Sequence, residues 1–153
     1  MTDGLGIYET QVFGTPLPAP GNFTVKSNVA EDPVYSGSLH QAANLIDGDP
    51  STLAYPGSTH IDYQVMLGQR TQLSSAFIDW GVFGSNPIYV TSWTLLARDG
   101  AGQPWVTLAT GGFPNSAGTL LNLDSTATEV RIIADSLNWI GIYELQLKGS
   151  PLQ

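Results

Sequence analysis

The feature of this sequence that most constrains its fold is the alternation of apolar and polar residues in short runs. In the run 61–67 every second residue is apolar, so one face of a strand would carry Ile61, Tyr63, Val65 and Leu67. Similar runs occupy 76–80, 92–97, 105–109, 120–123, 129–134 and 142–147. Turn-forming residues separate many of the runs, for example at Gly68, Asp99-Gly100 and Gly111-Gly112. The pattern predicts an all-β chain folded as an antiparallel β-sandwich, or jelly roll.

One short segment, 38–46, departs from this pattern. Its apolar residues recur at helical spacing, and Ser38 could cap the first turn. We therefore expect about two turns of helix there, with a buried face formed by Leu39, Ala42, Ala43 and Ile46.

Composition excludes several classes of function. Thirteen acidic and five basic side chains give a net charge of -8, which argues against nucleic acid as a partner. The chain has no cysteine, so it has neither disulfides nor thiolate chemistry. No apolar run approaches the roughly 18 residues of a membrane span, so we expect no membrane insertion. Nucleophile-elbow, phosphate-loop and paired-histidine motifs are also missing, which predicts that the chain is not an enzyme.

Residues 5–17 echo residues 140–152. Both segments read Gly-Ile-Tyr-Glu and then, in the same register, Gln, Gly, Pro and Leu. We interpret residues 1–18 as the last strand of a preceding repeat plus a linker, and residues 19–153 as the sandwich, a monomeric module in a tandem array. The alternative is an extra N-terminal strand that pairs within this domain, and the sequence leaves both open.

Several segments, in order, resemble the discoidin-like (coagulation-factor type C) modules and family 32 carbohydrate-binding modules. The segment 44–52 resembles the Asn-Ala-Ile-Asp-Gly-Asp-x-x-Thr turn of that family, and 97–105 resembles its Ser-x-Asp-Gly-x-x-Trp turn. The segments 63–68, 130–132 and 142–145 resemble later strands, although Met66 stands where the family has Asp. The resemblance implies a galactose-binding-domain-like sandwich that binds a glycan without catalysis. It also implies an extracellular parent protein, which the lack of cysteine suggests is bacterial.

The turn in 47–52 is a candidate metal site. Asp47, Asp49 and Thr52 place several oxygens in one tight turn, and Ca²⁺ takes six to eight oxygen ligands. Taken alone, the turn is better explained as an Asx-turn capped by Asp47. The resemblance implies a structural Ca²⁺ that also uses backbone carbonyls and the C-terminal Glu, which alternation places opposite an apolar face. The implied site comprises Asn44, Asp47, Asp49, Thr52, Tyr143 and Glu144.

Three loops are candidates for glycan binding, because relatives with this fold use loops at one end of the sandwich. Trp139 would offer an aromatic ring to a sugar, with polar side chains around it. The predicted ligand-binding residues are Tyr55, His60, Phe83, Asn86, Asn138 and Trp139. We expect the other tryptophans, Trp80, Trp93 and Trp105, to lie in the core. None of the three arginines clearly falls in these loops, which departs from galactose-type and fucose-type relatives.

Two other functions remain open at this stage. The chain could be an adhesion or spacer repeat that contacts protein or has no small ligand. It could also be an intracellular interaction module with the same fold, which the absence of cysteine permits.

Overall fold

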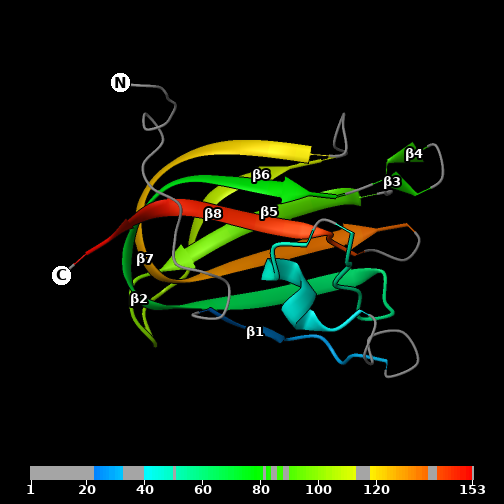
Figure 1. The fold of residues 1–153 in the computed structure, drawn as a ribbon, viewed down its shortest axis with the longest axis horizontal. Coiled ribbons are helices and arrows are strands. Elements are labelled where there is room, and N and C mark those ends of the chain that lie inside the picture. The colour runs from blue at the N-terminus through cyan, green and yellow to red at the C-terminus, as the bar shows by residue number, and fades with distance from the viewer. Residues whose placement is uncertain are drawn as a thin grey trace.

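The computed structural model describes residues 23–32, 40–49, 51–80, 82–83, 86–87, 90–112, 118–137 and 141–152. These residues form a β-sandwich of antiparallel strands with one short helical turn, which confirms the predicted fold class (Figure 1). The elements are β1 (Thr24–Ser27), η2 (Ala42–Ile46), β2 (His60–Asp79), β3 (Val82–Phe83), β4 (Asn86–Pro87), β5 (Val90–Arg98), β6 (Val106–Gly111), β7 (Gly118–Ser136) and β8 (Glu144–Pro151). No helix among the described residues is both long enough and apolar enough to cross a membrane.

Two long strands, β2 and β7, run through both layers of the sandwich. The first half of β2 pairs with β1 and with the second half of β7, and the order continues to β5 and β6. The second half of β2 pairs with β8 and with the first half of β7. Both long strands bend together (Figure 1), so the two halves of each strand contribute to opposing layers.

Gly68 does not end a strand as the sequence predicted. β2 continues from His60 to Asp79, and the register with β7 shifts between Met66 and Thr71. The runs around 120–123 and 129–134 are likewise parts of one strand, β7. Because β7 bends in step with β2, backbone pairing resumes after the shift and the chain needs no turn there.

The core lies between the two layers. The predicted inward face of 61–67 is confirmed, since its four apolar side chains are at most 1% exposed. Trp80 and Trp93 are also buried, with ring centroids 6.2 Å apart, as expected for large aromatics. Leu73 and Ile78 contribute from the second half of β2.

The helical segment is shorter than predicted. The described part is a single 3₁₀ turn, Ala42–Ile46, which follows Gln41, while Ser38 and Leu39 lie outside the described residues. Ile46 is buried and Ala42 packs against the core as predicted, but Ala43 is exposed and Leu45 is fully buried, so the prediction is wrong at Ala43. A 3₁₀ turn has three residues per turn, so Leu45 rather than Ala43 lies near the partly buried Ala42.

The sandwich has two ends, one at the bend of β2 and one where β2 begins and ends. β1 begins opposite Met66 and β8 ends opposite Thr71, so both flank the bend of β2. We call this the bend end. His60 and Asp79, the first and last residues of β2, lie at the other end, which we call the loop end (Figure 1).

Candidate functional site

The turn at 47–52 gathers oxygens around one point. Gly48 has φ 78°, a left-handed conformation that favours glycine. Asp47 accepts hydrogen bonds through both oxygens, Oδ1 from the Asp49 amide at 2.9 Å and Oδ2 from the Thr52 hydroxyl at 2.6 Å. The Thr52 hydroxyl also lies 3.0 Å from the Asp49 carbonyl. The Asx-turn expected of Asp47 is therefore present, and it places a carboxylate, a hydroxyl and a carbonyl together.

The Asp49 carboxylate does not point to this group of oxygens but binds Ser51. It accepts hydrogen bonds from the Ser51 hydroxyl at 2.6 Å and the Ser51 amide at 2.9 Å, which lower the pKa of Asp49. Asp49 therefore offers the turn its backbone carbonyl rather than its side chain.

Glu144, the first residue of β8, lies against this turn although 96 residues separate it from Gly48. Its Oε2 accepts a hydrogen bond from the Gly48 amide at 3.2 Å, and the side chain is 4% exposed. Its Oε1 is buried and has no hydrogen-bond partner in the described part of the chain. Burial, followed by the neighbouring Asp47 charge, raises the pKa of Glu144 to about 7.

Backbone pairing holds the start of β8 in place. Ala54 and Ile142 exchange hydrogen bonds of 2.9 and 3.0 Å, and the Tyr143 amide donates to the Asp79 carbonyl at 2.9 Å. Within η2, the Nδ2 group of the buried Asn44 side chain donates to the Leu53 carbonyl at 3.2 Å. These bonds fix Glu144 relative to the turn before any ligand is considered.

The residues fit a hard cation. Two carboxylates, Asp47 and Glu144, face each other where burial and mutual repulsion disfavour two negative charges, and Glu144 Oε1 lacks a donor. A cation between them would offset the repulsion of the two carboxylates and give Glu144 Oε1 a partner. The described residues contain no group of three His, Cys, Asp or Glu side chains that could hold a metal. The remaining ligands would have to be carbonyl, hydroxyl and water oxygens, as Ca²⁺ accepts.

Two of the six predicted glycan-binding side chains are described, and both lie at the loop end. The Tyr55 amide donates to the His40 carbonyl at 3.0 Å, and the two rings meet edge to face with centroids 6.0 Å apart. His60 Nδ1 lies 2.6 Å from Asp135 Oδ1, and these side chains are 44% and 52% exposed. The loop before β2 thus carries a partly exposed aromatic ring, and the start of β2 forms a half-exposed pair with β7.

The loop that carries Tyr55 ends beside the last residue of β7. The Ser136 amide donates to the Thr59 carbonyl at 2.9 Å, one step beyond the pairing of His60 with Asp135. The short β3–β4 hairpin lies at the same end (Figure 1). Its backbone pairs Phe83 with Asn86, but these two side chains lie outside the described part, as do Asn138 and Trp139.

Trp105 is not a core residue as the sequence predicted. It is half-buried on the outer face of the sheet, with the guanidinium carbons of Arg98 and Arg131 4.5 and 5.5 Å from its ring centroid. Trp105 precedes β6 rather than lying in it, so strand alternation does not set its direction.

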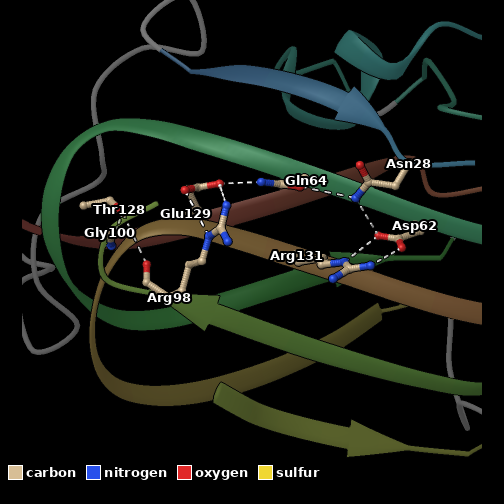
Figure 2. Close-up of polar contacts among 8 residues, drawn as sticks. All are labelled: Asn28, Asp62, Gln64, Arg98, Gly100, Thr128, Glu129 and Arg131. Atoms are coloured by element: carbon tan, nitrogen blue, oxygen red, sulfur yellow. Dashed lines mark hydrogen bonds and ion pairs between the residues drawn. The ribbon is translucent and has the colours of Figure 1, made fainter. Parts of the chain in front are cut away.

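A polar network covers the same outer face (Figure 2). Arg98 forms a two-bond pair with Glu129 at 3.1 Å, and Arg131 donates to Asp62 at 2.8 Å. The hydrogen bonds from Arg98 lower the pKa of Glu129. Burial acts to raise the pKa of Asp62, but the hydrogen bonds from Arg131 and Asn28 and the charge of Arg131 together outweigh burial, so the pKa is lowered. The network satisfies its own charges and therefore stabilises the sheet rather than offering free groups to a ligand.

A shallow pocket of about 290 Å³ lies on the outer face of the other layer. It is lined by Ser75, Phe77, Leu120, Gln146 and Lys148, from three neighbouring strands. Sequence analysis did not single out this surface, because each strand contributes only one or two of these residues.

No known family model matches the sequence, and a search of curated proteins finds no match. Many solved structures do share the fold. The C-terminal domain of a chitobiase from Bacteroides fragilis has a TM-score of 0.72 and 19% identity, covering 89% of this chain and 99% of that one. The family 32 module of Clostridium perfringens NanJ, solved with galactose, has a TM-score of 0.70 and 21% identity over 87% and 97% of the two chains. A chitosan-binding module from a Paenibacillus chitosanase/glucanase has a TM-score of 0.68 and 18% identity, covering 84% of this chain and 96% of that one.

The chain has the fold of a family 32 carbohydrate-binding module. The resemblance inferred from the sequence is confirmed at this level. Some of the similar structures are isolated modules, and others are parts of larger enzymes, such as a fucosidase of Ruminococcus gnavus of which the match covers 26%.

Proposed function

We propose that this sandwich is a non-catalytic carbohydrate-binding module of a larger extracellular, bacterial protein, and that it binds a glycan through its loop end. The observation that carries the proposal is the position of the half-exposed His60–Asp135 pair and the Tyr55 ring, which lie together where β2 begins and β7 ends. Solved structures with the same fold include modules bound to galactose and to a GalNAc-galactose disaccharide.

The chemistry of these loops suits a neutral sugar. A sugar ring stacks its apolar face on an aromatic side chain and bonds its hydroxyls to polar groups. Tyr55 and Trp139 are the candidate rings, and His60, with the residues Asn86 and Asn138, would bond the hydroxyls. The net charge of -8 disfavours anionic glycans by long-range repulsion.

We also propose that Ca²⁺ stabilises the loop end by bridging the 47–52 turn to Glu144. The ion would supply positive charge between two facing carboxylates and would not take part in a reaction. Asp47 and Glu144 are themselves poorly suited to glycoside hydrolysis. Glycosidase carboxyl groups must reach the substrate from either side of the scissile bond, whereas Glu144 is 4% exposed and its Oε2 is bonded to the Gly48 amide.

Affinity electrophoresis on immobilised glycans tests the binding site. The gels would contain galactan, chitosan and, as an anionic comparison, alginate. We expect retardation on a neutral or amino-sugar polymer, and at least tenfold weaker binding for His60→Ala and for Trp139→Ala. Trp105→Ala is the matched control, because it removes a tryptophan from the outer sheet face and should leave retardation unchanged.

Two other outcomes would change the assignment. Loss of binding in Phe77→Ala but not in Trp139→Ala would move the site to the shallow pocket on the second layer. No retardation on any glycan would refute glycan binding and favour an adhesion or spacer repeat.

A further inference from the structure

The structure imposes strict requirements on the sequence of β8 and the residues just before it. A Cβ at position 149 would lie 2.2 Å from the Gln72 carbonyl oxygen, and a Cβ at position 141 would lie 2.8 Å from the Ala54 carbonyl oxygen. Neither backbone oxygen can move without breaking its strand pairing. Both positions therefore require glycine.

Burial restricts the positions between these glycines. Ile142 is fully buried, Leu145 is 2% exposed and Leu147 is 7% exposed, and all three belong to the core. Glu144 is buried beneath the 47–52 turn. Lys148 and Ser150 are exposed, so those two positions are free to vary.

Residues 5–17 meet nearly all of these requirements when they are placed on residues 140–152. Gly6 and Gly14 fall on the two positions that only glycine can occupy, and Ile7 and Glu9 fall on the buried Ile142 and Glu144. A chance likeness between two outer strands would not place glycine at both steric positions.

The differences between the two segments follow the same logic. The exposed Lys148 is replaced by Phe13, and the core Leu147 by the apolar Val12. Thr10, in place of Leu145, is the one substitution that the core of this domain does not favour. The core of another copy could differ around it.

We propose that residues 5–17 are the β8 strand of a second copy of this sandwich, which lies upstream in the same polypeptide. Residues 18–22 then join the two copies, and the next copy begins just before β1. The partner of residues 5–17 is thus the β2 edge of the upstream copy rather than any strand of the domain described here.

The fold makes such an array compatible with binding at every copy. β1 begins and β8 ends at the bend end, so the linkers on both sides of a copy leave from the end opposite the loops. Each loop end stays unobstructed. Linked copies could then engage neighbouring sites on one polymer and gain avidity.

A fusion in which residues 19–139 directly precede residues 5–153 tests the proposal. Residues 5–17 would then serve as β8 of the first copy, followed by the natural linker and the second copy. We expect two folded sandwiches, with about twice the calorimetric unfolding enthalpy and near-UV circular dichroism per molecule of the natural chain. Gly14→Val in the fusion should reduce both signals to those of one sandwich, because its Cβ would meet the equivalent of the Gln72 carbonyl.

The 153-residue chain provides the matched control. Gly14→Val, or deletion of residues 1–18, should leave its melting temperature unchanged, since these 153 residues include no second sandwich with which residues 5–17 could pair. Loss of stability in either variant would show that the segment pairs within this domain and would overturn the proposal. One folded sandwich in the fusion, even with Thr10→Leu to restore the core leucine, would also overturn it. These measurements report folding alone, so they do not depend on whether the module binds a glycan.

Discussion

Glu144→Gln is the substitution that most directly tests the site between the 47–52 turn and β8. The pKa of Glu144 is raised from 4.5 to about 7, so the folded state binds its proton more tightly than the unfolded state does. Without metal, stability should fall as pH rises from about 4.5 to about 7. A shift of about 2.5 pKa units corresponds to at most about 3 kcal/mol.

Glutamine removes this cost. Its carbonyl oxygen can accept the Gly48 hydrogen bond, and its NH₂ group can donate to Asp47 where Glu144 Oε1 has no partner. In a chelator at pH 8 we therefore expect the variant to be more stable than the natural chain by up to about 3 kcal/mol, or roughly 10 °C in melting temperature. At pH 4.5 the difference should largely vanish.

Calcium should reverse the order at pH 8. Ca²⁺ at 1,000 times its dissociation constant would stabilise the natural chain by about 4.1 kcal/mol, which exceeds the advantage of glutamine, whereas the variant has lost a carboxylate ligand and should gain much less. Differential scanning calorimetry of both proteins, with and without Ca²⁺ at the two pH values, measures both the cost of the buried carboxylate and the stabilisation by Ca²⁺. A variant that is less stable than the natural chain in chelator at pH 8 would refute the account of the buried carboxylate. An unchanged melting temperature on adding Ca²⁺ to the natural chain would refute the metal site.

Three further substitutions test the packing on which the site depends. Tyr63→Phe should leave the free energy of unfolding, measured by chemical denaturation, unchanged or raise it by about 1 kcal/mol, because the buried Tyr63 hydroxyl has no hydrogen-bond partner among the described residues. A loss above about 1 kcal/mol would contradict this reason. Arg131→Met should cost about 3–5 kcal/mol at pH 7, because it leaves Asp62 buried without its cation. That cost should shrink as pH falls below about 4, because the ion pair that lowers the pKa of Asp62 stabilises the folded state only where the carboxyl is ionised. A cost that does not change with pH would exclude the ion pair as its source. Trp105→Ala should cost about 1–2 kcal/mol in urea titrations through two lost cation–π contacts, and a cost above about 4 would indicate a core position after all.

The strands and their inward faces could be predicted from the sequence because every second side chain of a strand faces the core and is therefore apolar. The proximity of Asp47 and Glu144 could be anticipated only through the family resemblance, since no local pattern links residues so far apart. The bend of β2 could not be predicted. Gly68 looks the same in a turn as in a bent strand, and the difference lies in whether β7 bends beside it.

Trp105 shows a second limit of the sequence. An aromatic residue next to an apolar run favours the core on average, but the direction of a side chain outside a strand depends on partners from other strands. Here those partners are Arg98 of β5 and Arg131 of β7, which are 33 residues apart in the sequence and meet only because β5 pairs with β7. The sequence indicated that no arginine clearly falls in the predicted loops, but it could not show that Arg98 and Arg131 cover the sheet.

The likeness between residues 5–17 and 140–152 also bears on the role of Glu144. A carboxylate buried without a full set of partners is costly, and a strand selected only for packing would lose it readily. Glu9 nevertheless occupies the equivalent place in the N-terminal segment, whereas the core position next to it has changed from leucine to threonine. If the two segments are the same strand of two copies, a core contact has varied while the unfavourable carboxylate has not. That is the pattern expected of a residue kept for a ligand, and it is why the cation and the array support each other although separate experiments test them.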